Sequence, residues 1–287
     1  MLTEFATLLQ QERSRSGAAV AFTCYGFETA VAVLQAAEKA GRGVILLISA
    51  QSYAAPQGTY LVEGLRALAA QAPVPVCLQL DHLRELEQIE RAFQQGIGAV
   101  MADGSHLPFE ENLAFTREAV ALARRYGGAI EAELGRIEGD EERAEAVRAG
   151  ALTDPEQAAS FVEEAAPACL AVSIGNVHGL YQREPAFDWE RLTTLRARLR
   201  LPLALHGASG LSDALLQRAI ALGIGKINVN TELRINYFEV LAQRLETCRP
   251  GARLLDLQSA LIAAQRATAL ARLQACQLAE VGPPDSP

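Results

Sequence analysis

The chain has 287 residues, of which 50% are hydrophobic and 6% aromatic, and its formal net charge at pH 7 is −8. This length and hydrophobic content suffice for one large domain, and the acidic balance argues against a general nucleic-acid-binding or membrane-surface protein. The five cysteines form no CxxC pair, and the sequence has neither a cleavable apolar leader nor an apolar run of about 18 residues. We therefore expect a complete cytoplasmic chain that binds neither nucleic acid nor membranes.

Short apolar runs alternate with longer segments of helical periodicity along the whole sequence. Eight runs are continuously hydrophobic, as strands covered on both faces require, and lie at residues 18–25, 43–49, 75–81, 99–105, 129–135, 169–175, 202–208 and 226–232. Helical periodicity is clearest at residues 28–40, 60–71, 86–95, 111–126, 154–165 and 213–222. The alternation predicts an α/β fold, a closed (β/α)8 TIM barrel. A doubly wound open sheet is the alternative, weakened because no GxGxxG follows the first strand.

Three segments lie outside this alternation of strands and helices. Residues 254–279 form a long Ala- and Leu-rich amphipathic segment after the eighth strand, which predicts extra C-terminal helices that cap the barrel or pack against another subunit. We expect a single barrel domain over residues 1–280 and a disordered, proline-rich tail over residues 281–287. Residues 136–151 carry many acids and few apolar side chains, which is typical of a mobile loop or of a lid that closes over substrate.

Potential metal ligands gather at the carboxyl ends of the predicted strands. His82, His178 and His206 follow the third, sixth and seventh strands. The carboxyl ends of parallel strands meet at one end of a barrel, so three imidazoles placed there indicate a metal site. A lone histidine at a strand end is more often a structural residue, and we assign that role to His106, which lies in a turn before the next helix. Other polar side chains at these ends include Asp81, Asp103, Ser105, Glu131 and Glu133.

The loops after the seventh and eighth strands have the small residues and hydroxyl groups that suit a phosphate. They contain Gly207, Ala208 and Ser209, followed by Asn228, Val229, Asn230 and Thr231. Small residues let backbone N–H groups approach an anion, Ser209 and Thr231 add hydroxyl donors, and these loops are the usual phosphate position in a (β/α)8 barrel. The sequence therefore predicts a phosphate site beside the metal site.

Six motifs, in order along the chain, carry a resemblance to a known family. They are LDH at residues 80–82, MADGSHLPFEEN at 101–112, EAELGRIEGDEE at 131–142, GNVHG at 175–179, HGASGL at 206–211 and KINVNTEL at 226–233. From near Ala18 to the C-terminal helices, the sequence resembles the class II, metal-dependent ketose-bisphosphate aldolases. It is most similar to the tagatose-bisphosphate type and to the related aldolase of inositol breakdown.

The resemblance implies a role for each matched residue. His82, His178 and His206 correspond to the three zinc ligands, and Asp81 to the acid/base at the hydroxyl of the bond that is cleaved. Glu133 corresponds to the carboxylate linked to proton transfer at the carbon of dihydroxyacetone phosphate, with Glu131 as a second candidate. The residues that match the site of that phosphate product are Gly179, Gly207, Ala208, Ser209, Asn228, Val229, Asn230 and Thr231. A monovalent cation (Na⁺ or K⁺) near the phosphate and a homodimer or homotetramer are also implied, with an accessory subunit as a further partner.

The chemistry of carbon–carbon cleavage agrees with these residue types. Cleavage leaves an enediolate, whose negative charge needs a Lewis acid unless a lysine forms a Schiff base. We expect Lys226 at the start of the eighth strand, far from the site, which disfavours the Schiff-base route. Asp81 can accept the hydroxyl proton, and Asn228 can hydrogen-bond the enediolate.

We therefore expect a zinc-dependent lyase that reversibly cleaves a ketose (bis)phosphate to dihydroxyacetone phosphate and an aldehyde such as glyceraldehyde 3-phosphate. The substrate would be of the tagatose- or fructose-1,6-bisphosphate type. Residues 22–27 and 49–52 depart from the family's usual pattern near the distal half of the substrate, so another keto-sugar, such as 6-phospho-5-dehydro-2-deoxygluconate, is an alternative. A non-catalytic barrel subunit is a second alternative, although the intact ligand set argues against it. A metal-dependent hydrolase would need an HxH pair on the first strand, which residues 21–23 do not provide.

Overall fold

The computed structural model describes residues 1–137, 152–179, 181 and 183–278. Eight parallel strands close into a barrel in the order of the sequence, and β8 pairs back with β1 through Val20 and Ile227. The strands are β1 (Ala19–Thr23), β2 (Val44–Ser49), β3 (Val76–Leu83), β4 (Ala99–Ala102), β5 (Ala129–Leu134), β6 (Cys169–Val172), β7 (Leu203–Leu205) and β8 (Ile224–Val229). The predicted (β/α)8 barrel is confirmed.

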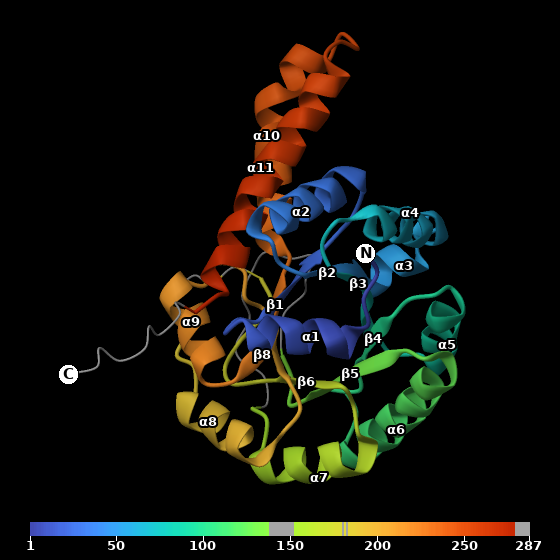
Figure 1. Ribbon diagram of the computed structural model, residues 1–287, viewed down its shortest axis with the longest axis vertical. Helices are drawn as coiled ribbons and strands as arrows, with labels where there is room; N and C mark the ends of the chain where they lie inside the picture. The colour runs from blue at the N-terminus through green and yellow to red at the C-terminus, as the bar shows by residue number, and fades with distance from the viewer. Residues whose placement is uncertain (138–151, 180, 182, 279–287) are drawn as a thin grey trace, which may run out of the picture.

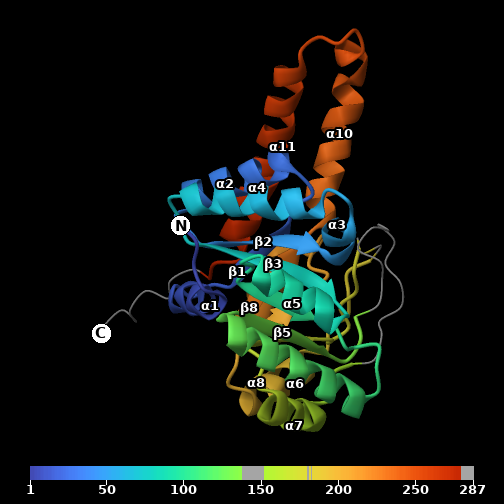
Figure 2. The same cartoon turned by 90° about the vertical axis from the view of Figure 1, so that its right-hand side faces the viewer.

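Helices surround the barrel on its outer side (Figures 1 and 2). They are α1 (Phe5–Ser14), α2 (Phe27–Ala40), α3 (Ala50–Ala54), α4 (Gly58–Gln71), α5 (Leu86–Gln94), α6 (Phe109–Tyr126), α7 (Pro155–Ala165), α8 (Trp189–Arg198), α9 (Asp213–Ala221), α10 (Thr231–Cys248) and α11 (Leu254–Ala275). Asp154 caps α7 by accepting from the backbone N–H groups of Glu156 and Gln157, as its sequence predicts. None of the described helices is both long and apolar enough to cross a bilayer.

Helix α1, which the sequence pattern did not predict, covers the amino-terminal end of the barrel (Figure 1). Its Phe5, Leu8 and Leu9 are buried and pack against inward-facing strand residues that include Ala19 and Cys77. These interior residues are small, so bulky side chains from α1 can fill that end of the barrel. A site inside the barrel that is open to solvent must therefore lie at the carboxyl ends of the strands.

Several strands end earlier than the hydrophobic runs do. The predicted strand at 226–232 ends at Val229, because Thr231 already begins α10. The runs at 169–175 and 202–208 end at Val172 and Leu205, short of the left-handed Gly175 (φ 105°) and Gly207 (φ 65°). The extra residues therefore form βα loops, where functional side chains of this architecture lie.

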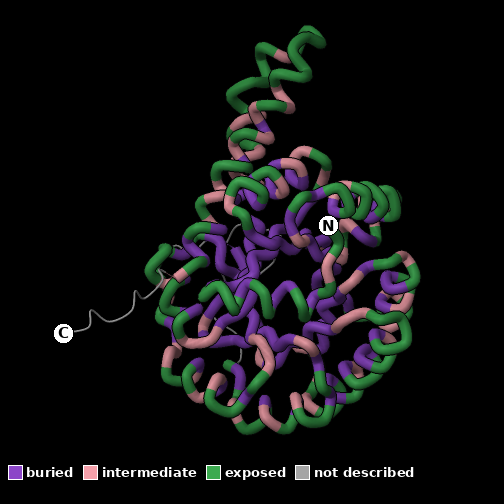
Figure 3. Tube along the Cα trace, in the orientation of Figure 1, coloured by how far each residue is buried: buried purple, intermediate pink, exposed green. Residues whose placement is uncertain are grey.

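The C-terminal helices α10 and α11 form a hairpin that projects beyond the barrel (Figures 1 and 2). The inner part of α11 packs on α2, and the outer part of the hairpin is mostly exposed (Figure 3). Extra C-terminal helices are thus confirmed, although α10 was not foreseen and α11 ends at Ala275. The predicted tail at 281–287 and the possible lid at 138–151 lie outside the described residues, and the single-domain boundary at residue 280 stays a prediction.

Candidate active site

Three histidines converge at the carboxyl end of the barrel. His82 lies on β3, His178 in the loop after β6, and His206 directly after β7. The ring centroid of His82 lies 5.2 Å from those of His178 and His206, and the latter two are 5.9 Å apart. One nitrogen from each ring lies within 4.8 Å of those of the other two rings. This spacing suits a single ion bound by three imidazoles.

Carboxylates fix the orientation of two of these rings. Nδ1 of His82 donates to Asp103 at 3.1 Å, and Nε2 of His206 donates to Glu131 at 2.7 Å. A metal would therefore bind Nε2 of His82 and Nδ1 of His206. His206 is fully buried, and its Nδ1 has no hydrogen-bond partner within the described part of the chain. A buried nitrogen of this kind is costly unless something binds it, so the geometry fits a metal ion.

His178 is held in the neutral form that a metal ligand requires. Its side chain is 6% exposed. Burial, together with positive charge on His82 and His206, holds the pKa of His178 well below its usual value. A neutral imidazole keeps a lone pair for coordination at neutral pH.

Asp103 is the site residue that the sequence pattern placed at a strand end without giving it a role. Its carboxylate accepts from Arg84 Nη2 at 3.0 Å and from Ser105 Oγ at 2.6 Å, in addition to His82. Burial alone would raise the pKa of Asp103, but its hydrogen bonds and the nearby positive charges hold that pKa well below the usual range. The sequence signals were its position after β4, beside the strand that carries His82, and its place in the motif at residues 101–112.

Beneath the histidines, a buried polar network links β3, β5 and β8. Nζ of Lys226 lies 2.8 Å from Glu131 Oε2 and donates to Asn228 Oδ1 at 2.6 Å. Gln79 also donates to Glu131 Oε2, at 2.8 Å, and Nδ2 of Asn228 lies 3.3 Å from Asp81 Oδ2. Glu131, one of the two candidates for proton transfer, is therefore occupied by an ion pair and by His206.

The expected position of Lys226 was wrong. It is the third residue of β8, and its ammonium group lies inside the barrel in contact with Asn228. Burial lowers the pKa of Lys226, but negative charge on Glu131 and Asp81 outweighs that effect and holds the pKa above its usual value. The Schiff-base route is still disfavoured, now because the amine is protonated and ion-paired.

Asp81 and Glu133 are buried carboxyls that differ in their surroundings. Asp81 is fully buried and bonded to Asn228, and its Oδ1 has no hydrogen-bond partner among the residues that the structure describes. Glu133 offers an oxygen within 4.8 Å of ligand atoms of His82 and Asp103. Burial, followed by the charge of Asp103, raises the pKa of Glu133 to about 8. Glu133 is thus protonated at neutral pH and can donate a proton.

The predicted phosphate loops lie together beside the histidines. Gly207 packs so closely on the carbonyl of Val177 that a Cβ would overlap it, and Gly179 is left-handed (φ 99°). The hydroxyl of Tyr181, in the loop after β6, joins that loop to the loop after β7, accepting from the Val177 N–H at 3.1 Å and donating to the Gly207 carbonyl at 2.9 Å. The predicted glycines therefore allow two backbone segments to approach each other.

The remaining predicted phosphate residues contribute in different ways. Ala208 and Val229 are buried in the hydrophobic core, so only their backbone can face a ligand. The hydroxyl of Ser209 accepts from the Asn230 N–H at 3.2 Å, and a hydroxyl that accepts one hydrogen bond can still donate another. Thr231 begins α10, so a helix N-terminus lies next to these loops, as anion sites favour.

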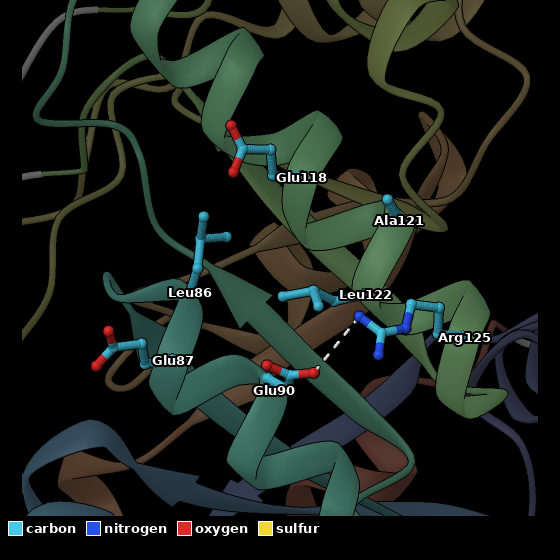
Figure 4. A pocket seen from close by; sticks show the side chains of 7 residues that line it. All are labelled: Leu86, Glu87, Glu90, Glu118, Ala121, Leu122 and Arg125. Atoms are coloured by element: carbon cyan, nitrogen blue, oxygen red, sulfur yellow. Dashed lines mark ion pairs between the residues drawn. The ribbon is translucent and has the colours of Figure 1, made fainter.

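Two other features lie away from this cluster. His106 is exposed in a turn and is not among the described groups that could hold a metal. A surface groove between α5 and α6 is lined by Leu86, Glu87, Glu90, Glu118, Ala121, Leu122 and Arg125 (Figure 4). Its polar members include the Glu90–Arg125 ion pair (3.6 Å), and it holds none of the histidines. The histidine cluster at the carboxyl end of the barrel is therefore separate from this groove.

Known proteins are similar to this chain in both sequence and fold. The family described as fructose-bisphosphate aldolase class-II matches residues 3–280. The chain is 41% identical over 234 residues to the D-tagatose-1,6-bisphosphate aldolase subunit GatY of Klebsiella oxytoca, covering 81% of this chain and 82% of that one.

Solved structures agree with this match. The YdjI aldolase of Escherichia coli K12 superposes with a TM-score of 0.84 at 31% identity, covering 96% of this chain and 97% of that one. The fructose-bisphosphate aldolase of Campylobacter jejuni, at 19% identity, a TM-score of 0.78 and coverage of 96% and 95%, supports the fold alone. Together with a match that spans nearly the whole chain, these findings show that the protein belongs to the class II fructose-bisphosphate aldolase family of aldehyde-lyases.

Proposed function

We propose that this chain reversibly cleaves a ketose bisphosphate of the tagatose- or fructose-1,6-bisphosphate type to dihydroxyacetone phosphate and glyceraldehyde 3-phosphate. The observation that carries the proposal is the convergence of His82, His178 and His206 beside a buried Asp81. Loops with closely packed glycines adjoin the same cluster. Residues suited to metal binding, proton transfer and phosphate binding thus adjoin one another at one end of the barrel.

Zn²⁺ fits the three histidines. Imidazole is a preferred zinc ligand, and three protein ligands leave a coordination position for substrate oxygens. His206 Nδ1, which is buried and has no hydrogen-bond partner among the described residues, and the neutral His178 both suit a bound cation. When bound, the ion acts as a Lewis acid that stabilises negative charge on the substrate's oxygens.

The chain's own residues perform the proton transfers in this proposal. Asp81 accepts the proton of the hydroxyl at the bond that breaks, so that this oxygen becomes the aldehyde carbonyl. The Asn228 amide donates to the enediolate that forms from the other half of the sugar. Glu133, protonated at neutral pH, supplies the proton that converts this enediolate to dihydroxyacetone phosphate.

We assign the phosphate of dihydroxyacetone phosphate to Gly179, Gly207, Ser209 and the start of α10. The backbone N–H groups of these loops and the Ser209 and Thr231 hydroxyls can donate to it. Backbone carbonyls of the same loops could hold Na⁺ or K⁺ beside the phosphate, as we propose for a second cation. A titration of activity with Na⁺, K⁺ and the larger Cs⁺ tests this assignment.

The comparison with GatY, which is described as acting on D-tagatose-1,6-bisphosphate, favours tagatose-1,6-bisphosphate as the substrate. Fructose-1,6-bisphosphate differs from it at one stereocentre, and the residues around the distal half decide between them. Tyr25, which hydrogen-bonds Asn230, lies in the loop after β1, where we place that distal half. The 6-phospho-5-dehydro-2-deoxygluconate type remains the second candidate, favoured by the unusual 22–27 segment.

A screen of ketose phosphates for release of dihydroxyacetone phosphate, with and without added Zn²⁺, tests the proposal. Asp81→Ala should retain Zn²⁺ and lose cleavage, whereas His206→Ala should lose both. Full activity after exhaustive chelation, or wild-type turnover of Asp81→Ala, would contradict the assignment. A barrel that binds no metal and cleaves nothing would instead support the non-catalytic subunit.

We also propose that the chain forms a homodimer or homotetramer in the cytoplasm. The hairpin of α10 and α11 exposes large apolar side chains, with Phe238 and Leu254 each 64% and Leu255 76% exposed. Large apolar side chains exposed on one hairpin suit an interface between subunits. The five unpaired cysteines suit a reducing compartment. Analytical ultracentrifugation of the protein alone should show a dimer or tetramer, and a monomer would leave an accessory subunit as the expected partner.

A further inference from the structure

We propose that Lys226 is a positioning residue, whose ammonium group orients both the amide of Asn228 and the carboxylate of Glu131 beneath the reactive site. The inference rests on the proposed function and deepens it. Lys226 touches no atom of a bound sugar in this scheme. It acts through two neighbours, one that contacts the reacting atoms and one that holds a metal ligand.

The first arm of this arrangement fixes the Asn228 amide. An ammonium group has donors and no acceptor, so the atom that faces Nζ at 2.6 Å must be the amide oxygen. The amide nitrogen then faces the other way, 3.3 Å from Asp81 Oδ2 and 3.3 Å from His206 Nε2. The two ends of an amide are nearly identical in shape, so packing alone cannot choose between them. Lys226 makes that choice and directs the Asn228 N–H donors toward the site.

The second arm holds Glu131. Its Oε2 lies 2.8 Å from Nζ of Lys226, and its Oε1 accepts from His206 Nε2 at 2.7 Å. Glu131 thereby keeps the His206 proton on Nε2 and directs Nδ1 toward the other histidines. Because the Lys226 ammonium group is bonded to both Asn228 and Glu131, it positions the Asn228 amide and, through Glu131, the metal ligand His206.

A purely structural role explains this lysine poorly. The side chains of Lys226 and Glu131 are both 0% exposed to solvent, and Ala204, the neighbour of Lys226 on β7, is a small apolar residue. Replacing a buried ion pair with apolar groups is often neutral or stabilising, so such a pair is weak evidence for stability. Lys226 contacts Asn228 directly and reaches His206 through Glu131. These contacts indicate a role in the reaction instead.

A double-mutant cycle on kcat tests the first arm. In the wild type, Asn228→Ala should lower kcat by about 100- to 1,000-fold, as loss of a donor to a developing oxyanion does. In a Lys226→Met background, the same change should cost less than about tenfold, because the amide is no longer oriented. Lys226→Met alone should lower kcat and change KM by less than about threefold.

Gln79→Met is the matched control. Gln79 is equally buried and its amide nitrogen donates to the same oxygen of Glu131, whereas its amide oxygen has no hydrogen-bond partner among the residues that the structure describes. Asn228→Ala should therefore keep its full cost in the Gln79→Met background. Equal costs of Asn228→Ala in the wild-type and Lys226→Met backgrounds would overturn the first arm of the proposal.

Calorimetric titration of the metal-free protein with Zn²⁺ tests the second arm without any turnover. Lys226→Met should weaken Zn²⁺ binding about tenfold, whereas Asn228→Ala should change it by less than about threefold. Unchanged Zn²⁺ affinity in Lys226→Met would overturn this arm, even if the wild type cleaves no ketose phosphate and the proposed function fails. If Lys226→Met does not fold, Lys226→Met/Glu131→Gln removes both charges, and Glu131→Gln becomes the reference for the cycle and the titration.

Discussion

Replacing Asp103 with asparagine should weaken Zn²⁺ binding although Asp103 is not itself one of the three ligands. The Asp103 carboxylate accepts from Nδ1 of His82 at 3.1 Å and from two nitrogens of Arg84 through the same oxygen, Oδ2. Its other oxygen accepts from the N–H and hydroxyl of Ser105. Asparagine has one oxygen and one NH₂ group in place of the two carboxylate oxygens, so it keeps only one of these two acceptors. An NH₂ group would then face the donors of either His82 and Arg84 or Ser105.

The magnitude follows from the bond to His82. With at most a neutral amide oxygen in place of the carboxylate at Nδ1, the ring is held less firmly with Nε2 directed at the metal, and loss of such a partner costs about 10- to 100-fold in metal affinity. That corresponds to about 1.4 to 2.8 kcal/mol of binding free energy. Arg84 is 57% exposed at its side chain, so water can replace its lost bonds, and we expect little of the effect to come from it.

Calorimetric titration of the metal-free protein with Zn²⁺ measures this change. Asp188→Asn is the matched control, because Asp188 also accepts from a backbone N–H and from an arginine, in this case Arg191, at the start of α8. The control should bind Zn²⁺ as the wild type does. If Asp103→Asn binds Zn²⁺ within threefold of the wild type, the Asp103–His82 bond does not orient a metal ligand and the reasoning fails.

Three further changes test other parts of the structure. The pKa of Glu133 is raised from 4.5 to about 8, so its contribution to the stability of the metal-free protein is full below pH 4.5 and is lost as the pH rises to about 8. Glu133→Gln should flatten the dependence of melting temperature on pH in that window, and an unchanged slope would contradict the shift. Phe5→Ala should lower the free energy of unfolding by about 3 to 5 kcal/mol in urea, since Phe5 is fully buried, whereas the 46% exposed Leu2→Ala should cost under about 0.5 kcal/mol. Tyr181→Phe should raise KM for a ketose phosphate by several-fold and leave Zn²⁺ affinity unchanged, because the hydroxyl joins the loops after β6 and β7, which carry the proposed phosphate residues Gly179 and Gly207; equal KM values would show that the link is dispensable.

The barrel and its histidines could be predicted from the sequence because both depend on local patterns. Apolar runs alternate with helical segments, and the carboxyl ends of parallel strands meet in space whatever the strand tilt. His82, His178 and His206 each follow such a run, so their convergence needed no knowledge of side-chain contacts. The same logic brought Asp81, Glu133 and the glycine-containing loops to the site.

The contacts between distant strands could not be predicted in this way. The position of Lys226 was misjudged because Gly223 and Gly225 interrupt the apolar run, although β8 already begins at Ile224. Its contact with Glu131 joins β8 to β5 across the barrel interior, and that pairing depends on the tilt and stagger of the strands. Helix α1 was missed for a related reason. Its apolar residues pack against small side chains at the end of the barrel that it covers, and this contact also joins distant parts of the chain.

The backbone of β3 explains how Asp81 and His82 can both serve the site. Neighbouring residues of a regular strand point to opposite faces, so one of the two should face away from the barrel interior. Here the register between β3 and β4 shifts between Leu80 and Leu83, and His82 adopts a left-handed conformation with φ of 55°. This irregularity allows Asp81 to reach Asn228 while His82 turns toward His178 and His206. A left-handed histidine costs conformational energy, and such strain is retained mainly where function requires it. The strained residue therefore supports the proposed roles of Asp81 as acid/base and of His82 as metal ligand at one site.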